Sequence, residues 1–425
     1  DKVLNNQPFS VVLSLTSDLV KINYQGEALK QGQEVKGKFS VAGNSVKQLL
    51  EWQNIPLEAK DEAFNQFSLD GEMNYTGNVL NLSGITAKLD ELKFTSSSTV
   101  TFSNPINITS NIDLGVLNLN PYLTDSPSDK PSNAKDAAQP LEWDNSPIDL
   151  SALKTINANL SIKSSQLLVK EIKLGKSELG LTLKDGVANI QLNSFEGYEG
   201  KGNGLITVNA NTSQYKITNK FTLNEINAEP LLTDAIGFDK LMGKGNLTWQ
   251  LSTSGISQRD FIEKLNGNID FSFNDGAIRG ANLAAIAKSA NSIVKGDLSA
   301  IDLDRNFSNA EKTDFAALTG LFSLNNGVAS TNNLSLKNPF IRMHGTGDIN
   351  LPKTEVKLQV QTKMVASTEG QDAQAEQSGF VIPIKIKGPF HEIKVRPDIS
   401  EATKDKLKNK LEEKLKDKLK TLFGQ

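Results

Sequence analysis

The chain has 425 residues, enough for two or three ordinary domains or for one elongated domain. It carries 46 Lys and Arg against 49 Asp and Glu, and this net charge of −3 argues against a nucleic-acid-binding protein, which usually has a basic excess. Cysteine is absent, which excludes disulfides, thiolate nucleophiles and cysteine-ligated zinc but leaves the cellular compartment open.

The start of the sequence bears on membrane attachment. No apolar run approaches the roughly 20 residues that a membrane-spanning helix needs, and the first residues do not have a signal-peptide pattern. The first residue is Asp1 rather than Met, and a strand pattern begins almost at once, at Phe9. We therefore expect the sequence to be a fragment that lacks an N-terminal portion with a membrane anchor.

Two-residue alternation of apolar and polar side chains is the dominant pattern, and it predicts half-buried β-strands. The alternating apolar positions, in chain order, are Phe9, Val11, Leu13 and Leu15; Ile156, Ala158, Leu160 and Ile162; Phe221 and Leu223; Leu247, Trp249 and Leu251; Ile269, Phe271 and Phe273; Val356, Leu358 and Val360; and Phe380, Ile382, Ile384 and Ile386. Because Ser, Thr, Asn and Lys stand between them, we expect a sheet with one apolar and one polar face.

Four Asp-Gly or Asn-Gly pairs interrupt the strand-like segments. They are Asp70-Gly71, Asp185-Gly186, Asp275-Gly276 and Asn326-Gly327. Such pairs favour the positive φ of tight turns, so each predicts an antiparallel hairpin. Residues 108–125 also resemble residues 217–234 without a gap, and this repetition indicates a sheet extended by repeated units.

Few segments have helical or disordered character. Apolar residues at helical spacing predict a helix over residues 281–295 and short helices over residues 45–52 and 258–265. Residues 124–147, with four prolines and many small polar residues, and residues 366–378 are predicted to be disordered. The first of these two segments divides the chain into a smaller and a larger sheet region.

The tail, residues 400–425, predicts an amphipathic helix because an apolar residue recurs every four positions. The stripe consists of Leu407, Leu411, Leu415, Leu419 and Phe423. Eight lysines and five acidic residues surround it. Two interpretations stay open at equal weight, a helix that contacts a membrane surface and a cap on the end of the sheet, with a helical partner as a lesser third.

Candidate catalytic residues are scarce. The histidines are His344 and His391, and neither has an acidic partner at motif spacing. The glycine-rich stretch from Gly200 to Gly204 resembles a phosphate-binding loop, but a strand pattern follows it instead of a helix. We therefore predict a protein without catalytic residues, metal ligands or a cofactor, and not an enzyme.

From Pro147 onward, a set of short motifs occurs in the order found in one family. They include Pro147-Ile-Asp-Leu-Ser-Ala-Leu153, Leu183-Lys-Asp-Gly186, Gly197-Tyr-Glu-Gly-Lys-Gly202, Gly237-Phe-Asp-Lys-Leu241 and Arg396-Pro397-Asp398. In these motifs and their order the sequence resembles the AsmA family of bacterial envelope proteins. No single motif is specific, but the shared order is.

The resemblance implies a fold and a location. Members are anchored in the inner membrane of Gram-negative bacteria, project into the periplasm and resemble bridge-like lipid carriers. The expected fold is mainly β, an elongated and strongly curved antiparallel sheet that forms an open apolar groove, with few short helices. The expected regions are an N-terminal β-sheet region (1–123), a linker (124–147), an AsmA-like groove region (148–399) and the amphipathic helix (400–425).

The resemblance also implies a function, the non-enzymatic transport of phospholipid between the inner and outer membranes, contributing to outer-membrane biogenesis. The expected partners are phospholipid and bacterial membranes, not nucleic acid, and we expect a monomer. The residues predicted to line the groove are Ile156, Leu160, Ile162, Phe221, Leu223, Leu247, Trp249, Leu251, Ile269, Phe271, Val356, Leu358, Val360, Phe380, Ile382 and Ile384.

Two alternatives remain. The apolar faces can instead bury one another in a closed core, as in an ordinary two-layer domain. The function can instead be that of an envelope assembly protein, which holds outer-membrane proteins at exposed strand edges.

Overall fold

The computed structural model describes residues 7–29, 32–52, 54, 59–123, 142–280, 282, 308–339, 341–364 and 381–397. Over these ranges the chain is mainly β, as predicted, with 21 strands and three short α-helices. It divides into two compact units, the first holding β1 to β12 and the second most of β14 together with β15 to β21. The residues of β13 (Tyr215–Asn227) are divided between the two units.

The strands of the first unit are β1 (Phe9–Thr16), β2 (Val20–Leu29), β3 (Glu34–Gly43), β4 (Phe67–Thr76), β5 (Val79–Leu89), β6 (Leu92–Thr101), β7 (Ile106–Asn118), β8 (Ile156–Val169), β9 (Ile172–Leu174), β10 (Ser177–Lys184), β11 (Val187–Gly197) and β12 (Gly200–Asn209). The helix α1 (Val46–Trp52) and one-turn 3₁₀ helices at Asn120–Tyr122 and Ser151–Lys154 accompany them. Strands β1 to β7 pair antiparallel in chain order, and so do β10 to β12.

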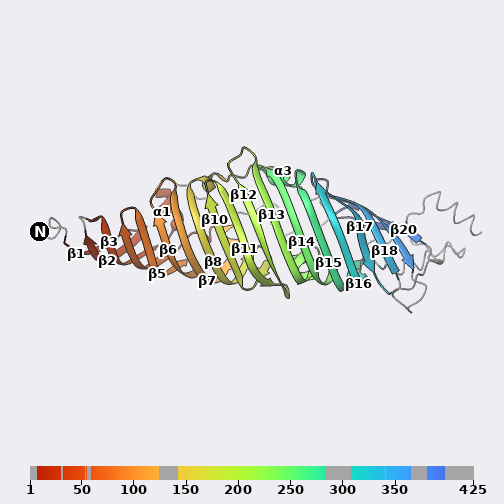
Figure 1. Ribbon diagram of the computed structural model, residues 1–425, viewed down its shortest axis with the longest axis horizontal. Helices are drawn as coiled ribbons and strands as arrows, with labels where there is room; N and C mark the ends of the chain where they lie inside the picture. The colour runs from red at the N-terminus through yellow and green to blue at the C-terminus, as the bar shows by residue number, and fades with distance from the viewer. Residues whose placement is uncertain are drawn as a thin grey trace, which may run out of the picture. The chain divides into compact units, whose positions relative to one another are not determined.

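The elements of the second unit are α2 (Ala228–Ile236), β14 (Leu241–Gly255), α3 (Gln258–Glu263), β15 (Asn266–Gly280), β16 (Ser308–Asn325), β17 (Val328–Lys337), β18 (Ile341–Asn350), β19 (Glu355–Met364), β20 (Val381–Pro389) and β21 (Lys394–Pro397). Strands β14 to β21 all pair antiparallel with their chain neighbours. Within each unit the strands lie side by side in nearly chain order (Figure 1). The described pairings never join the first strand of a unit to its last, so each unit is an open sheet.

One pairing departs from the predicted antiparallel sheet. Strands β7 and β8 run parallel, in register from Ile106 opposite Ile156 to Asn118 opposite Leu168. β8 then pairs antiparallel with β9 and β10. A parallel pair needs a connection that returns the chain to the same end of the sheet, and residues 119–155 are long enough to do so. The sheet is therefore mixed, with the segment predicted as a linker acting as the crossover.

Two of the four predicted hairpin turns are confirmed and two are wrong. Asp185-Gly186 and Asn326-Gly327 are two-residue turns with positive φ at both positions. Asp70-Gly71 instead lies inside β4, and Asp275-Gly276 lies inside β15 at a change of register against β14. Asp275 has φ 46°, so it adopts the same left-handed conformation within a β-bulge. Turn residues alone cannot distinguish a bulge from a hairpin.

The short helices predicted over residues 45–52 and 258–265 are confirmed as α1 and α3. The sequence patterns did not predict α2. This helix ends where Gly237 adopts φ 69° and donates its N–H to the carbonyl of Thr233. The predicted helix 281–295, apart from Asn282, the disordered segment 366–378 and the tail 400–425 lie outside the described residues. So do residues 124–141 of the predicted linker, whereas Trp143, further along it, donates from Nε1 to the carbonyl of Leu351 at 2.9 Å.

Candidate functional site

The apolar face of the first unit is the candidate site. Leu160 of β8, Leu181 of β10, Ile190 of β11 and Ile206 of β12 lie directly opposite one another across the four strands. All four side chains are half-buried. The face is thus a continuous aliphatic surface that stays partly accessible.

The described α-helix of this unit buries no residue against that row. No residue of α1 is buried, so α1 does not form a second layer of core. A small buried cluster of Ala158, Leu183 and Ala188 lies beside the row. Leu160 and Leu181 of the row pack against this cluster, and so does Leu153 of a 3₁₀ helix. An aliphatic face without a helical layer is available for apolar ligand atoms.

Glycines on this face lie under aromatic rings. A Cβ placed on Gly204 of β12 would approach the ring of Phe221 to 2.3 Å, and one on Gly202 would approach the ring of Phe195 to 2.6 Å. Each ring therefore occupies the space above a bare backbone position of a neighbouring strand. The rings therefore keep the face apolar at positions where the sequence has glycine, a residue from which no apolar contact would be predicted.

The predicted lining divides into two groups in the second unit. Six of its members are half-buried, namely Leu247, Trp249, Leu251, Ile269, Phe271 and Leu358, and among them Phe271 packs against the core of this unit. Val360 and Ile384 instead belong to a packed core that also contains Phe273 and Met343, and Ala228 and Leu232 of α2 pack into the same core. The closed-core interpretation therefore applies to Val360 and Ile384, although alternation predicted that they line the groove.

The remaining predicted residues are placed as follows. Ile156, Leu160, Ile162 and Phe221 are half-buried, whereas Leu223 and Val356 are buried. Ile382 lies in β20 opposite Thr362 of β19. Phe380 and the tail residues Leu407, Leu411, Leu415, Leu419 and Phe423 lie outside the described residues.

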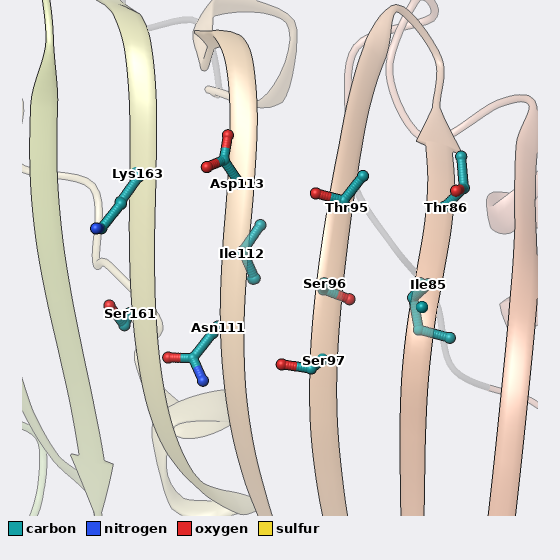
Figure 2. A pocket seen from close by; sticks show the side chains of 11 residues that line it. Ile85, Thr86, Thr95, Ser96, Ser97, Asn111, Ile112, Asp113, Ser161 and Lys163 are labelled. Atoms are coloured by element: carbon teal, nitrogen blue, oxygen red, sulfur yellow. The ribbon is translucent and has the colours of Figure 1, made fainter.

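The opposite face of the first unit is polar and has a shallow hollow of about 600 Å³ over β5 to β8. In Figure 2, Ser96 and Ile112 project to one side of their strands, and Ser97 and Asn111 project to the other. Lys163 on the polar side forms an exposed ion pair of 3.7 Å with Glu178. Ion pairs in water contribute little to stability, so this face has the character of an ordinary solvated surface.

Residues with catalytic potential are dispersed. His344 lies in β18 opposite Gln361 and Ser335, while His391 lies in the loop that follows β20. The glycine-rich stretch from Gly200 belongs to β12, which confirms the strand interpretation. In the described part of the chain, no group of three or more His, Asp or Glu side chains is arranged to hold a metal ion.

Among the described residues, no helix is both long and apolar enough to cross a membrane.

Comparison with known proteins gives one family. No curated protein and no solved structure matches the chain. The model of the AsmA family matches residues 122–334, which is half of the chain and includes the crossover, α2 and most of the strands from β8 to β17. The open mixed sheet agrees with the fold that the sequence motifs implied. The chain belongs to the AsmA family.

Proposed function

We propose that this protein carries phospholipid through the periplasm between the inner and outer membranes and thereby contributes to outer-membrane biogenesis. The acyl chains lie on the apolar face of the sheet, and no covalent chemistry takes place. The partners are phospholipid and the two membranes, and the protein acts as a monomer anchored to the inner membrane. Membership of the AsmA family is consistent with lipid transport or assembly in the envelope.

The observation that carries the proposal is the half-buried row from Leu160 to Ile206, against which the described α-helix of the first unit buries no residue. Burial of one methylene group is worth about 0.8 kcal/mol, so a lipid with ~30 acyl methylenes needs shelter equivalent to roughly 24 kcal/mol to leave a bilayer. A few isolated apolar residues do not supply this. A continuous face that crosses several strands does.

Native mass spectrometry of the purified protein tests the proposal. We expect adducts with the masses of two-chain phospholipids, and we expect the protein to move a fluorescent phospholipid from donor to acceptor vesicles. Protein that carries no lipid and does not accelerate transfer would contradict it. Delipidated protein reloaded with the same phospholipid is the control for carry-over from the host membrane.

A second candidate function rests on β1. This strand has no charged residue and no proline, and Val12 and Leu13 are 77% and 50% exposed. In the described pairings β1 contacts only β2, so its other edge is open to a further strand. Uncharged edges of this kind pair readily with other chains. An assembly protein would use the β1 edge to hold a nascent outer-membrane protein.

Val12→Lys separates the two functions because a lysine on an edge strand opposes strand addition. If β1 holds client proteins, this variant loses the complex with an unfolded outer-membrane protein and keeps its bound lipid. A variant that loses neither property leaves lipid transport as the function.

A further inference from the structure

Three hydroxyl groups interrupt the apolar face of the first unit. Ser98 of β6 and Ser110 of β7 lie opposite each other in a row that continues to Leu82 on one side and Leu160 on the other. Ser96 of β6 lies two residues from Ser98, in the neighbouring row. The alternation of these strands places all three on the face that carries the aliphatic residues.

The hydroxyl groups retain unused hydrogen-bonding capacity. Ser98 Oγ and Ser110 Oγ are 2.7 Å apart, so one hydroxyl donates to the other. Two hydroxyls have two protons, and this bond uses one. Among the described residues, neither group has another hydrogen-bond partner, and Ser96 Oγ has none. At least two O–H donors on the face are therefore without an acceptor.

The next strand repeats the feature independently. Ser164 of β8 is 6% exposed, and its Oγ has no hydrogen-bond partner within the described structure. It lies beside Leu114 of β7 and opposite Ser177 of β10. Its position, two and four residues beyond Ile162 and Leu160 on the same strand, places it on the same face. Hydroxyls without acceptors thus occur on β6, on β8 and in the Ser98–Ser110 pair that joins β6 to β7.

Such groups constrain the ligand. Ser96 and Ser98 are half-buried, so water accepts hydrogen bonds there, whereas Ser110 and Ser164 are buried. A bound acyl chain displaces that water and offers no acceptor. An ester carbonyl oxygen does accept, and it lies where the acyl chain joins the glycerol backbone. A ligand that places its ester groups at the serines satisfies the donors and keeps its chains on the aliphatic rows.

We propose that Ser98 and Ser110, together with Ser96, form a site that binds the ester carbonyls of a glycerolipid lying on the apolar face. This inference rests on the proposed function and adds to it a chemical class, ester-linked rather than ether-linked lipid. The alternative role for the serines is steric, since a small side chain permits close approach of neighbouring strands. Alanine keeps the small size and removes the hydroxyl, so it distinguishes the two roles.

The experiment uses the full chain and a pair of phosphatidylethanolamines with identical chains, one diacyl and one dialkyl ether. Both compete for the delipidated protein, and native mass spectrometry measures the bound ratio. We expect the unmodified protein to prefer the ester lipid by about tenfold, and the double variant Ser98→Ala/Ser110→Ala to bind both lipids equally. Ser97→Ala, on the polar side of the same strand in Figure 2, is the matched control and keeps the preference.

The outcomes separate the two proposals. Equal binding of both lipids by the unmodified protein overturns the ester site while lipid carriage stands. Binding of neither lipid overturns both proposals. A preference that survives in the double variant assigns the serines to the steric role. Ser96→Ala provides a second variant if the double variant does not fold, and it is expected to reduce the preference because it removes one unpaired donor.

Discussion

At the scale of single residues, the carboxylate of Asp90 joins three segments of the first unit. It accepts hydrogen bonds from the backbone N–H groups of Phe64 and Asn65, each at 2.8 Å, and from the hydroxyl of Tyr122 at 2.9 Å. Because Asp90→Ala leaves all three donors without this acceptor, we expect it to lower the free energy of unfolding by about 2–4 kcal/mol. Urea denaturation measures the change.

Asp113→Ala is the control for this prediction. Asp113 is an exposed carboxylate on the polar face of β7, and its removal should change the free energy of unfolding by less than about 0.5 kcal/mol. Equal stabilities of the two variants would show that Asp90 does not hold the three segments together.

Tyr122 gives a prediction about alkaline pH. Burial raises the pKa of its phenol, and so do its hydrogen bond to Asp90 and the negative charges of Asp90 and Glu91. A pKa raised on folding stabilises the native state fully below the unfolded value of about 10, and this contribution is lost as pH rises above it. We expect the free energy of unfolding to fall as pH rises above about 10, and to fall less steeply for Tyr122→Phe. Parallel slopes for the two proteins would contradict this.

These residue contacts were only partly predictable. Asp90 binds backbone groups 25 and 26 residues away, and sequence patterns give no signal for such a contact. The serines of β6 and β7 made these two strands harder to predict. Because Ser96, Ser98 and Ser110 replace apolar residues, they weaken the alternation that would have revealed the two strands. The serines that distinguish this part of the face are therefore also the reason why alternation did not predict its strands.

At the scale of elements, the bulge in β15 depends on a glycine. A Cβ on Gly276 would lie 2.1 Å from the carbonyl oxygen of Met242 and 2.5 Å from the ring of Phe315. Since the first of these atoms belongs to the backbone of β14, the clash requires the strands to move apart. We expect Gly276→Ala to lower the free energy of unfolding by about 2–4 kcal/mol, measured by urea denaturation.

Gly180→Ala is the matched control in β10. There a new Cβ would meet only the Cβ of Gln191, at 3.9 Å, which is an ordinary contact. Alanine also loses less conformational freedom than glycine in a strand, so this variant should be unchanged or more stable by up to about 1 kcal/mol. If both substitutions cost the same, the steric explanation for Gly276 is wrong.

The elements were predicted with uneven success for physical reasons. Strands with strict alternation, such as β8 and β15, could be predicted because each has one apolar face. Asp-Gly pairs indicated positive φ correctly at Asp185 and at Asp275, but the bond pattern around them differs between a hairpin and a bulge. The parallel pairing of β7 with β8 depends on where a long connection returns, which local sequence does not specify.

At the scale of the whole molecule, the sequence predicted the class of fold and its two faces, but not which apolar residues remain accessible. Alternation assigns a side chain to a face and carries no information about what covers that face. Leu160 and Ile384 have the same pattern in the sequence, yet Leu160 is half-buried and Ile384 is 0% exposed. The difference arises from the packed core of the second unit, to which the unpredicted helix α2 contributes.

This difference yields the last prediction, a comparison of Leu160→Lys with Ile384→Lys. A lysine at the half-buried position can extend its ammonium group to water, so the first variant should keep its strand circular dichroism and its melting transition. The same charge should interrupt the apolar path and reduce the rate of phospholipid transfer between vesicles at least tenfold. Ile384→Lys places a charge within a packed core, where it should abolish the cooperative melting transition.

Leu160→Ala is the control for this pair. It keeps the surface apolar, so transfer should fall less than threefold, as expected when the aliphatic rows act collectively and no single side chain is essential. If Leu160→Lys instead unfolds as Ile384→Lys does, the row from Leu160 to Ile206 is part of a closed core, and the first unit does not have the accessible face on which lipid carriage depends. If Leu160→Lys folds and its transfer rate is undiminished, the lipid path lies elsewhere.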